Sequence, residues 1–107
     1  MIRLTEKATQ YLWCDIGEFS FCNEDNGGLG FGRMEKLGIP ESEHYLITFR
    51  RTPKGKKRQG LIRMSFDTFG RYTGIEGCQA KFSKEELNEY EEYAVNALIK
   101  EGYLEKD

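Results

Sequence analysis

The stretches HYLITF (residues 44–49) and LIRMSF (residues 61–66) alternate apolar and polar side chains, as two paired β-strands do. Alternate residues of a strand face opposite sides of a sheet, so one set of side chains should enter the core. That set is Tyr45, Ile47, Phe49, Ile62, Met64 and Phe66. The opposite face is expected to carry Leu46, Thr48, Arg50, Arg63, Ser65 and Asp67. These two stretches therefore predict a central antiparallel β-hairpin.

The connection between the two predicted strands is strongly basic. Its sequence is RRTPKGKKRQG, residues 50–60. With Arg63, seven of the 16 basic residues fall within residues 50–63, and no acidic residue lies among them. A segment of this kind suits a partner that carries phosphate or carboxylate groups. The candidate partner-binding residues are Arg50, Arg51, Lys54, Lys56, Lys57, Arg58 and Arg63.

A long helix is predicted near the C-terminus. Ser83 and Glu86 have the spacing of a capping box, residues 84–101 contain no Gly or Pro, and Gly102 is expected to end the helix. One face is apolar: Leu87, Tyr90, Ala94, Ala97 and Leu98. Three acidic residues fall within about 60° of one another on the opposite face. They are Glu85, Glu89 and Glu92, which are also candidate partner-binding residues because a row of carboxylates can imitate phosphates.

The remaining segments give weaker patterns. Thr5 can cap a short N-terminal helix over residues 5–13, and residues 18–22 alternate as a strand does. A turn is predicted at residues 23–28, with a returning strand at residues 29–33. Between residues 68 and 80, only a short strand around residues 71–75 is predicted.

Length and composition favour one α+β domain over residues 1–107, built from a small antiparallel sheet of three to four strands on the long C-terminal helix. No apolar stretch approaches the roughly 20 residues that span a bilayer, and the N-terminus lacks a signal-peptide pattern. Membrane partners are therefore not expected, and we expect a cytoplasmic location. The sequence makes no prediction of the oligomeric state.

The sequence contains no recognisable catalytic motif, and it predicts neither a cofactor nor a metal site. His44 is the sole histidine, and Cys14, Cys22 and Cys78 form no CxxC pair. The cysteines are expected to be buried thiols. A small enzyme or metal carrier that uses these cysteines or His44 remains a third alternative.

Two binding functions remain, and both use the basic connection. The favoured one is a small interaction protein, a regulator or inhibitor of a nucleic-acid-handling protein, of the kind that phages and other mobile elements encode. The alternative is direct nucleic-acid binding. A protein partner is favoured because the net charge is −2 and no aromatic residue lies between Arg51 and Gly60 to stack on bases.

Overall fold

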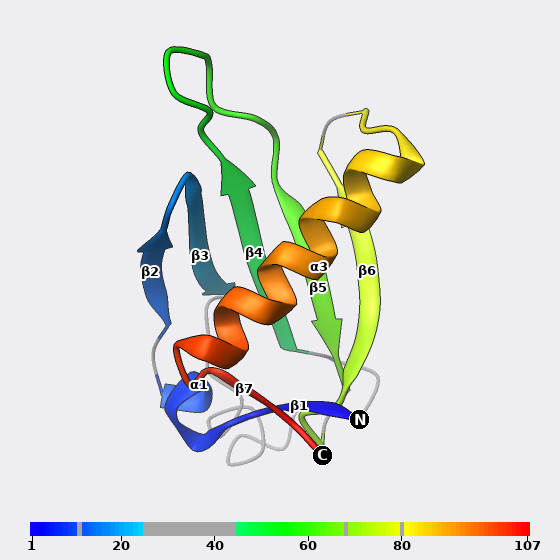
Figure 1. The fold of residues 1–107 in the computed structure, drawn as a ribbon. Helices are drawn as coiled ribbons and strands as arrows, with labels where there is room; N and C mark the ends of the chain where they lie inside the picture. The colour runs from blue at the N-terminus through cyan, green and yellow to red at the C-terminus, as the bar shows by residue number, and fades with distance from the viewer. Residues whose placement is uncertain (11, 25–44, 68, 80) are drawn as a thin grey trace.

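The computed structural model describes residues 1–10, 12–24, 45–67, 69–79 and 81–107. In chain order its elements are β1 (Ile2–Leu4), α1 (Glu6–Gln10), β2 (Trp13–Ile16), β3 (Phe19–Glu24), β4 (Tyr45–Arg51), β5 (Ile62–Phe66), β6 (Tyr72–Cys78), α3 (Lys84–Lys100) and β7 (Leu104–Lys106). Helix α3 crosses one face of a five-stranded sheet, as Figure 1 shows. The predicted α+β class is confirmed. No helix in the described part of the chain is long and apolar enough to cross a membrane.

The sheet is an antiparallel meander in the order β2-β3-β4-β5-β6. Its centre is the predicted hairpin, in which Ile47 pairs with Met64 and Phe49 pairs with Ile62. The predicted core face is confirmed for every member whose side chain is described, and these are buried: Ile47, Phe49, Ile62, Met64 and Phe66. The predicted count of three to four strands was wrong, because β2 and β6 extend the sheet to five and β1 and β7 form a separate pair.

An aromatic cluster joins the sheet to α3. The rings of Phe19, Phe21 and Phe49 lie 5.5 to 6.4 Å apart between centroids, and Phe19 contacts the ring of Tyr90 on α3 edge-on at 5.7 Å. Aromatic pairs favour such tilted and edge-on arrangements. The buried side chains of α3 are Tyr90, Ala94 and Leu98, all from the face predicted to be apolar. Because few residues supply this core, each ring carries a large share of the buried area.

The ends of α3 follow their sequence signals. The Ser83 side chain accepts a hydrogen bond from the Glu86 N–H at 3.1 Å, and the Ser83 N–H donates to the Glu86 carboxylate at 3.1 Å. The capping box is therefore confirmed. At the other end Gly102 has a φ of +83°, the left-handed conformation that commonly follows a helix and that glycine adopts without steric cost.

The N-terminal helix is shorter than the predicted range of residues 5–13. Helix α1 ends at Gln10, and Trp13 begins strand β2. The physical reason is a hairpin: Gly17 and Glu18 form a two-residue connection, with Ile16 paired to Phe19 across it. Gly17 has a φ of +59°, as the first position of a type II′ turn requires. Pairing with β3 therefore overrides the apolar spacing that suggested more helix.

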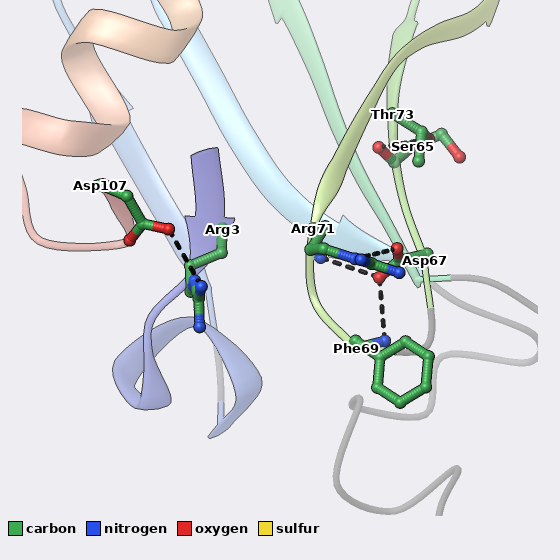
Figure 2. A network of polar contacts seen from close by, with 7 residues as sticks. All are labelled: Arg3, Ser65, Asp67, Phe69, Arg71, Thr73 and Asp107. Carbon is green, nitrogen blue, oxygen red and sulfur yellow. Dashed lines mark hydrogen bonds and ion pairs between the residues drawn. The ribbon is translucent and has the colours of Figure 1, made fainter. Parts of the chain in front are cut away.

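Strands β1 and β7 form a two-stranded antiparallel sheet beside the turn that follows β5. The Leu4 N–H donates to the Gly70 carbonyl at 2.8 Å, and Arg3 lies 3.0 Å from Asp107 in an ion pair. Figure 2 shows the turn itself, where the Asp67 carboxylate accepts hydrogen bonds from the N–H groups of Phe69 and Arg71 and from Arg71 Nε. Asp67 thus organises the turn on which β1 rests.

The structure places the other predicted segments to different extents. Residues 23 and 24 belong to β3 and not to the predicted turn, whereas the rest of that turn, the strand predicted at residues 29–33 and His44 lie outside the described residues. The strand predicted around residues 71–75 is β6, which runs further, to Cys78. Two register irregularities opposite β5 interrupt its alternation, which explains why its sequence pattern is weak.

Candidate partner-binding surface

At the end of β4, the first two of the predicted partner-binding arginines lie on different faces of the sheet. Arg50 pairs with Ser20 and Arg51 pairs with Phe19, so their side chains face opposite sides of the sheet. Arg51 lies on the side of α3, where it contacts Tyr90, and Arg50 lies on the opposite side, which we call the open face. Of the two, only Arg50 therefore belongs to the open face.

Arg51 is an anchor for the fold. Its Nε lies 2.8 Å from Glu18 Oε2, and its Nη1 donates to the Tyr90 hydroxyl at 3.1 Å. The hydrogen bonds to Tyr90 and then to Glu18 raise the pKa of Arg51 above its usual value. The hydrogen bonds from Arg51 and from the Lys54 N–H lower the pKa of Glu18. Because Nε and Nη1 are already engaged within the fold, Arg51 is less available to a partner than Arg50.

Backbone hydrogen bonds hold the tip of the hairpin. The Thr52 N–H donates to the Glu18 carbonyl at 2.8 Å, and the Gln59 N–H donates to the Arg51 carbonyl at 2.8 Å. Gly55 has a φ of +75° at the turn. The four tip cations are exposed: Lys54, Lys56, Lys57 and Arg58. Within the described residues none of their side chains forms an ion pair, so their charges remain available to a partner.

Two rows of side chains cross the open face. Strand register places Trp13, Cys22, Thr48 and Arg63 in one row. The neighbouring row contains Asp15, Ser20 and Arg50. Trp13 is 65% exposed, a large value for the largest aromatic side chain. The structure thus brings Arg50 and Arg63 onto the same face as an exposed aromatic ring.

A hollow of about 350 Å³ opens on this face, which we call the open-face hollow. Its side chains combine an aromatic ring, two guanidinium groups, a carboxylate and hydroxyl groups. They include Trp13, Asp15, Ser20, Thr48, Arg50 and Arg58. Arg58 comes from the hairpin tip, so the hollow is continuous with the basic segment. A second hollow of about 360 Å³ lies on the side of α3, where Arg51, Glu18 and Tyr93 line it.

The acidic residues of α3 lie away from this basic surface. Glu85, Glu89 and Glu92 are exposed, on the helix face opposite the buried Tyr90, Ala94 and Leu98. The sheet separates them from Arg50 and Arg63. One flat partner surface cannot contact both charged regions at once, and the basic side is the one that also has a hollow and an exposed aromatic ring.

The cysteines do not gather in one place. Cys14 pairs with Phe21 on the core face, whereas Cys22 pairs with Trp13 on the open face. The expectation of buried thiols is met only in part, because all three cysteines are half-buried. Burial raises the pKa of Cys14, and the nearby Glu101 and Asp15 act in the same direction. No cluster of three metal-ligating side chains occurs among the described residues.

Trp13 is the residue of this surface that sequence reasoning missed. The helical spacing of the N-terminal segment places it at the end of the predicted helix and gives no indication of a ligand-binding role. The signal that could have found it is the pair of alternating stretches WCDI and FSFC, joined by Gly17 and Glu18. As a hairpin, these stretches place Trp13 and Cys22 on the side opposite Phe19 and Phe21.

Comparison of the chain with protein-family models, with curated proteins and with solved structures found no match.

Proposed function

We propose that the protein binds nucleic acid through the basic hairpin and the adjoining open face. The observation that carries this proposal is the position of Arg50 and Arg58 at a hollow that also contains the exposed ring of Trp13. Sequence reasoning favours a protein partner because no aromatic residue accompanies the basic segment along the chain. An exposed ring that lines the same hollow as two arginines answers that objection, because aromatic and cationic side chains together are typical of nucleic-acid surfaces.

The distribution of charge supports the same proposal. The tip lysines and Arg58 are exposed, and the connection that carries them projects beyond the end of the sheet (Figure 1). The small net charge of −2 therefore conceals a strongly basic segment and an acidic helix face. A phosphate backbone that approached the basic side would meet an excess of positive charge, opposed within the hollow by Asp15, and the field of the protein would orient the encounter.

The test is a titration of fluorescently labelled DNA and RNA with the purified protein at about 50 mM and about 200 mM salt. We expect binding at the lower salt concentration and a steep loss of affinity at the higher one, because counterions are released when lysine and arginine contact phosphates. Absence of binding to every strand at the lower concentration would overturn the proposal.

A second candidate function is the regulation of a nucleic-acid-handling protein through an acidic patch on its surface. The fixed geometry of the tip favours it, because hydrogen bonds to Glu18 and Arg51 hold the two ends of the short segment that carries the four cations, a shape that fits a local anionic pocket. Nuclease-treated extracts of the host would test it. Capture of one partner by the native protein, and loss of that partner when the four tip cations are replaced by serine, is the expected result.

A further inference from the structure

The open-face hollow has the composition of a site for one unpaired nucleotide. We infer that it holds a single base stacked on Trp13, with neighbouring phosphates on Arg50 and Arg58, so that the protein prefers single strands to duplexes. This inference rests on the proposed function, which concerns phosphate binding by the basic hairpin, and it adds the form of nucleic acid that is bound.

The exposure of Trp13 is the first support. At 65% exposed, its ring contributes little to the core, whereas Phe21 and Phe49 on the other face are fully buried. An indole ring gives a flat apolar surface on which any base can stack, and such stacking is a main source of affinity in single-strand-binding proteins.

The distance between the aromatic ring and the arginines is the second support. Trp13 and Arg50 lie two strands apart and in adjacent rows, which places their backbone positions roughly 12 Å from each other. Long side chains reach into that interval, and the hollow of about 350 Å³ occupies it. This volume is near the lower end for small-molecule sites and suits one nucleotide. The arginine fork then binds phosphate through parallel N–H groups.

Two other lining groups, Asp15 and Ser20, suit a base edge. The Asp15 carboxylate can only accept hydrogen bonds when it is ionised, and the Ser20 hydroxyl can donate or accept. A carboxylate inside a basic hollow repels phosphate but accepts readily from the amino group of a base. A duplex keeps its bases stacked and paired, so it cannot present one base to this hollow without first opening.

The protein's sole tryptophan provides a direct test, because Trp13 is the only source of indole fluorescence. Single-stranded DNA and RNA of about 10 nucleotides, and the same sequences as duplexes, are titrated into the protein at about 50 mM salt. We expect single strands to quench Trp13 fluorescence to saturation, and duplexes to bind more weakly and with little quenching.

Three variants complete the experiment, with binding measured by anisotropy of labelled strands. Trp13→Ala should lose about 10-fold or more in affinity for single strands and most of the preference over duplexes. Trp13→Phe keeps a smaller stacking surface, so its affinity for single strands should lie between that of Trp13→Ala and that of the native protein. Phe69→Ala removes another exposed ring, 73% accessible and remote from the hollow, and should bind as the native protein does.

The possible failures are distinct. Salt-dependent binding without quenching, and with equal affinity for Trp13→Ala and the native protein, overturns the single-base site but leaves phosphate binding by the hairpin intact. No binding of any strand overturns the proposed function itself. If Trp13→Ala lacks the circular dichroism of the folded protein, the comparison of Trp13→Phe with Phe69→Ala decides the question.

Discussion

Arg50 and Arg51 are neighbours in the chain, yet their side chains lie on opposite faces of the sheet. Arg51 is engaged by Glu18 and by the Tyr90 hydroxyl, whereas Arg50 lines the open-face hollow. A cluster that looks uniform in the sequence is therefore divided into one arginine that holds the hairpin to α3 and another that is available to a partner. Replacing the two residues should have different effects.

The first prediction concerns the hairpin tip. Replacing Lys54, Lys56, Lys57 and Arg58 with serine should leave the fold intact, because all four side chains are exposed and unpaired among the described residues. Affinity for single strands should fall at least about 10-fold at low salt. The slope of log affinity against log salt should shrink by about 0.7 for each phosphate that the variant no longer binds.

The matched control has the same change in net charge at another place. It replaces Lys81, Lys84, Lys100 and Lys106, which are exposed and outside the hairpin, with serine. This control should bind nearly as the native protein does. Equal reductions of affinity in both variants would mean that net charge, and not the hairpin, determines binding.

The second prediction concerns acid stability. The pKa of Glu18 is lowered from its ordinary 4.5 by hydrogen bonds from Arg51 and from the Lys54 N–H, so its ionised form is favoured by folding. This contribution is fully present above pH 4.5 and is lost as the pH falls through the lowered pKa. Glu18→Gln should flatten the fall in unfolding free energy below pH 4.5, measured by urea denaturation at several pH values.

Asp67 also contributes to acid sensitivity. Burial raises the pKa of this carboxyl group, but hydrogen bonds from Arg71 and Phe69 outweigh burial and lower it overall. Its contribution is likewise lost as the pH falls, beginning near its ordinary value of 3.8. In the double variant Glu18→Gln with Asp67→Asn, the unfolding free energy should therefore depend less on acid pH than in either single variant. A pH dependence equal to that of the native protein would contradict this assignment.

The third prediction tests the turn between β2 and β3. Gly17 has a φ of +59°, and a Cβ atom there would lie 2.9 Å from the Tyr93 hydroxyl. Gly17→Ala should cost about 1–2 kcal/mol for the left-handed backbone alone. The clash adds to this cost, and Tyr93→Phe removes the clashing oxygen. In the Tyr93→Phe background the cost of Gly17→Ala should be smaller, and a double-mutant cycle of unfolding free energies measures the difference.

The fourth prediction concerns the capping box of α3. Ser83→Ala removes the acceptor for the Glu86 N–H and should lower the unfolding free energy by about 1 kcal/mol. Ser83→Asp keeps an acceptor and places a negative charge at the helix N-terminus, so it should restore the stability. Thermal denaturation of the three proteins checks this order, and equal midpoints would show that the cap contributes nothing.

The fifth prediction concerns Asp15 in the open-face hollow. Asp15→Asn removes a charge that repels phosphate, so overall affinity for single strands should rise. The ionised carboxylate accepts hydrogen bonds only, so it should favour cytosine, with its amino group, over thymine. The native protein should therefore prefer oligo-dC to oligo-dT, and the asparagine variant should lose that preference. A preference that survives the substitution would place the discrimination elsewhere.

The sequence predicts what depends on local pattern. The faces of the central hairpin and the Ser83–Glu86 cap are both local, since they need only the alternation of a strand or the spacing of a helix turn. The prediction for Trp13 was wrong because Ala8 and Leu12 continue a helical spacing up to it, and only pairing with β3 decides in favour of a strand. Competition between two local patterns is settled by tertiary contacts that no short window contains.

The open-face hollow could not be predicted for the same reason. It needs Trp13, Arg50 and Arg58 from two separate hairpins, and its position follows from the register between β2, β3 and β4. Strand order and register within a sheet are long-range properties. The basic residues are visible in the sequence, but their separation into an anchor and a free face depends on that register.

The pairing of β1 with β7 has a consequence for how the chain folds. The Asp107 N–H donates to the Met1 carbonyl at 2.9 Å, so the two segments that are furthest apart in the sequence meet in space. Closing a loop of this length costs conformational entropy before the contacts between β1 and β7 can compensate for it, and this cost slows folding. A circular permutant that joins residues 107 and 1 and opens the chain elsewhere would convert this pairing into a local hairpin.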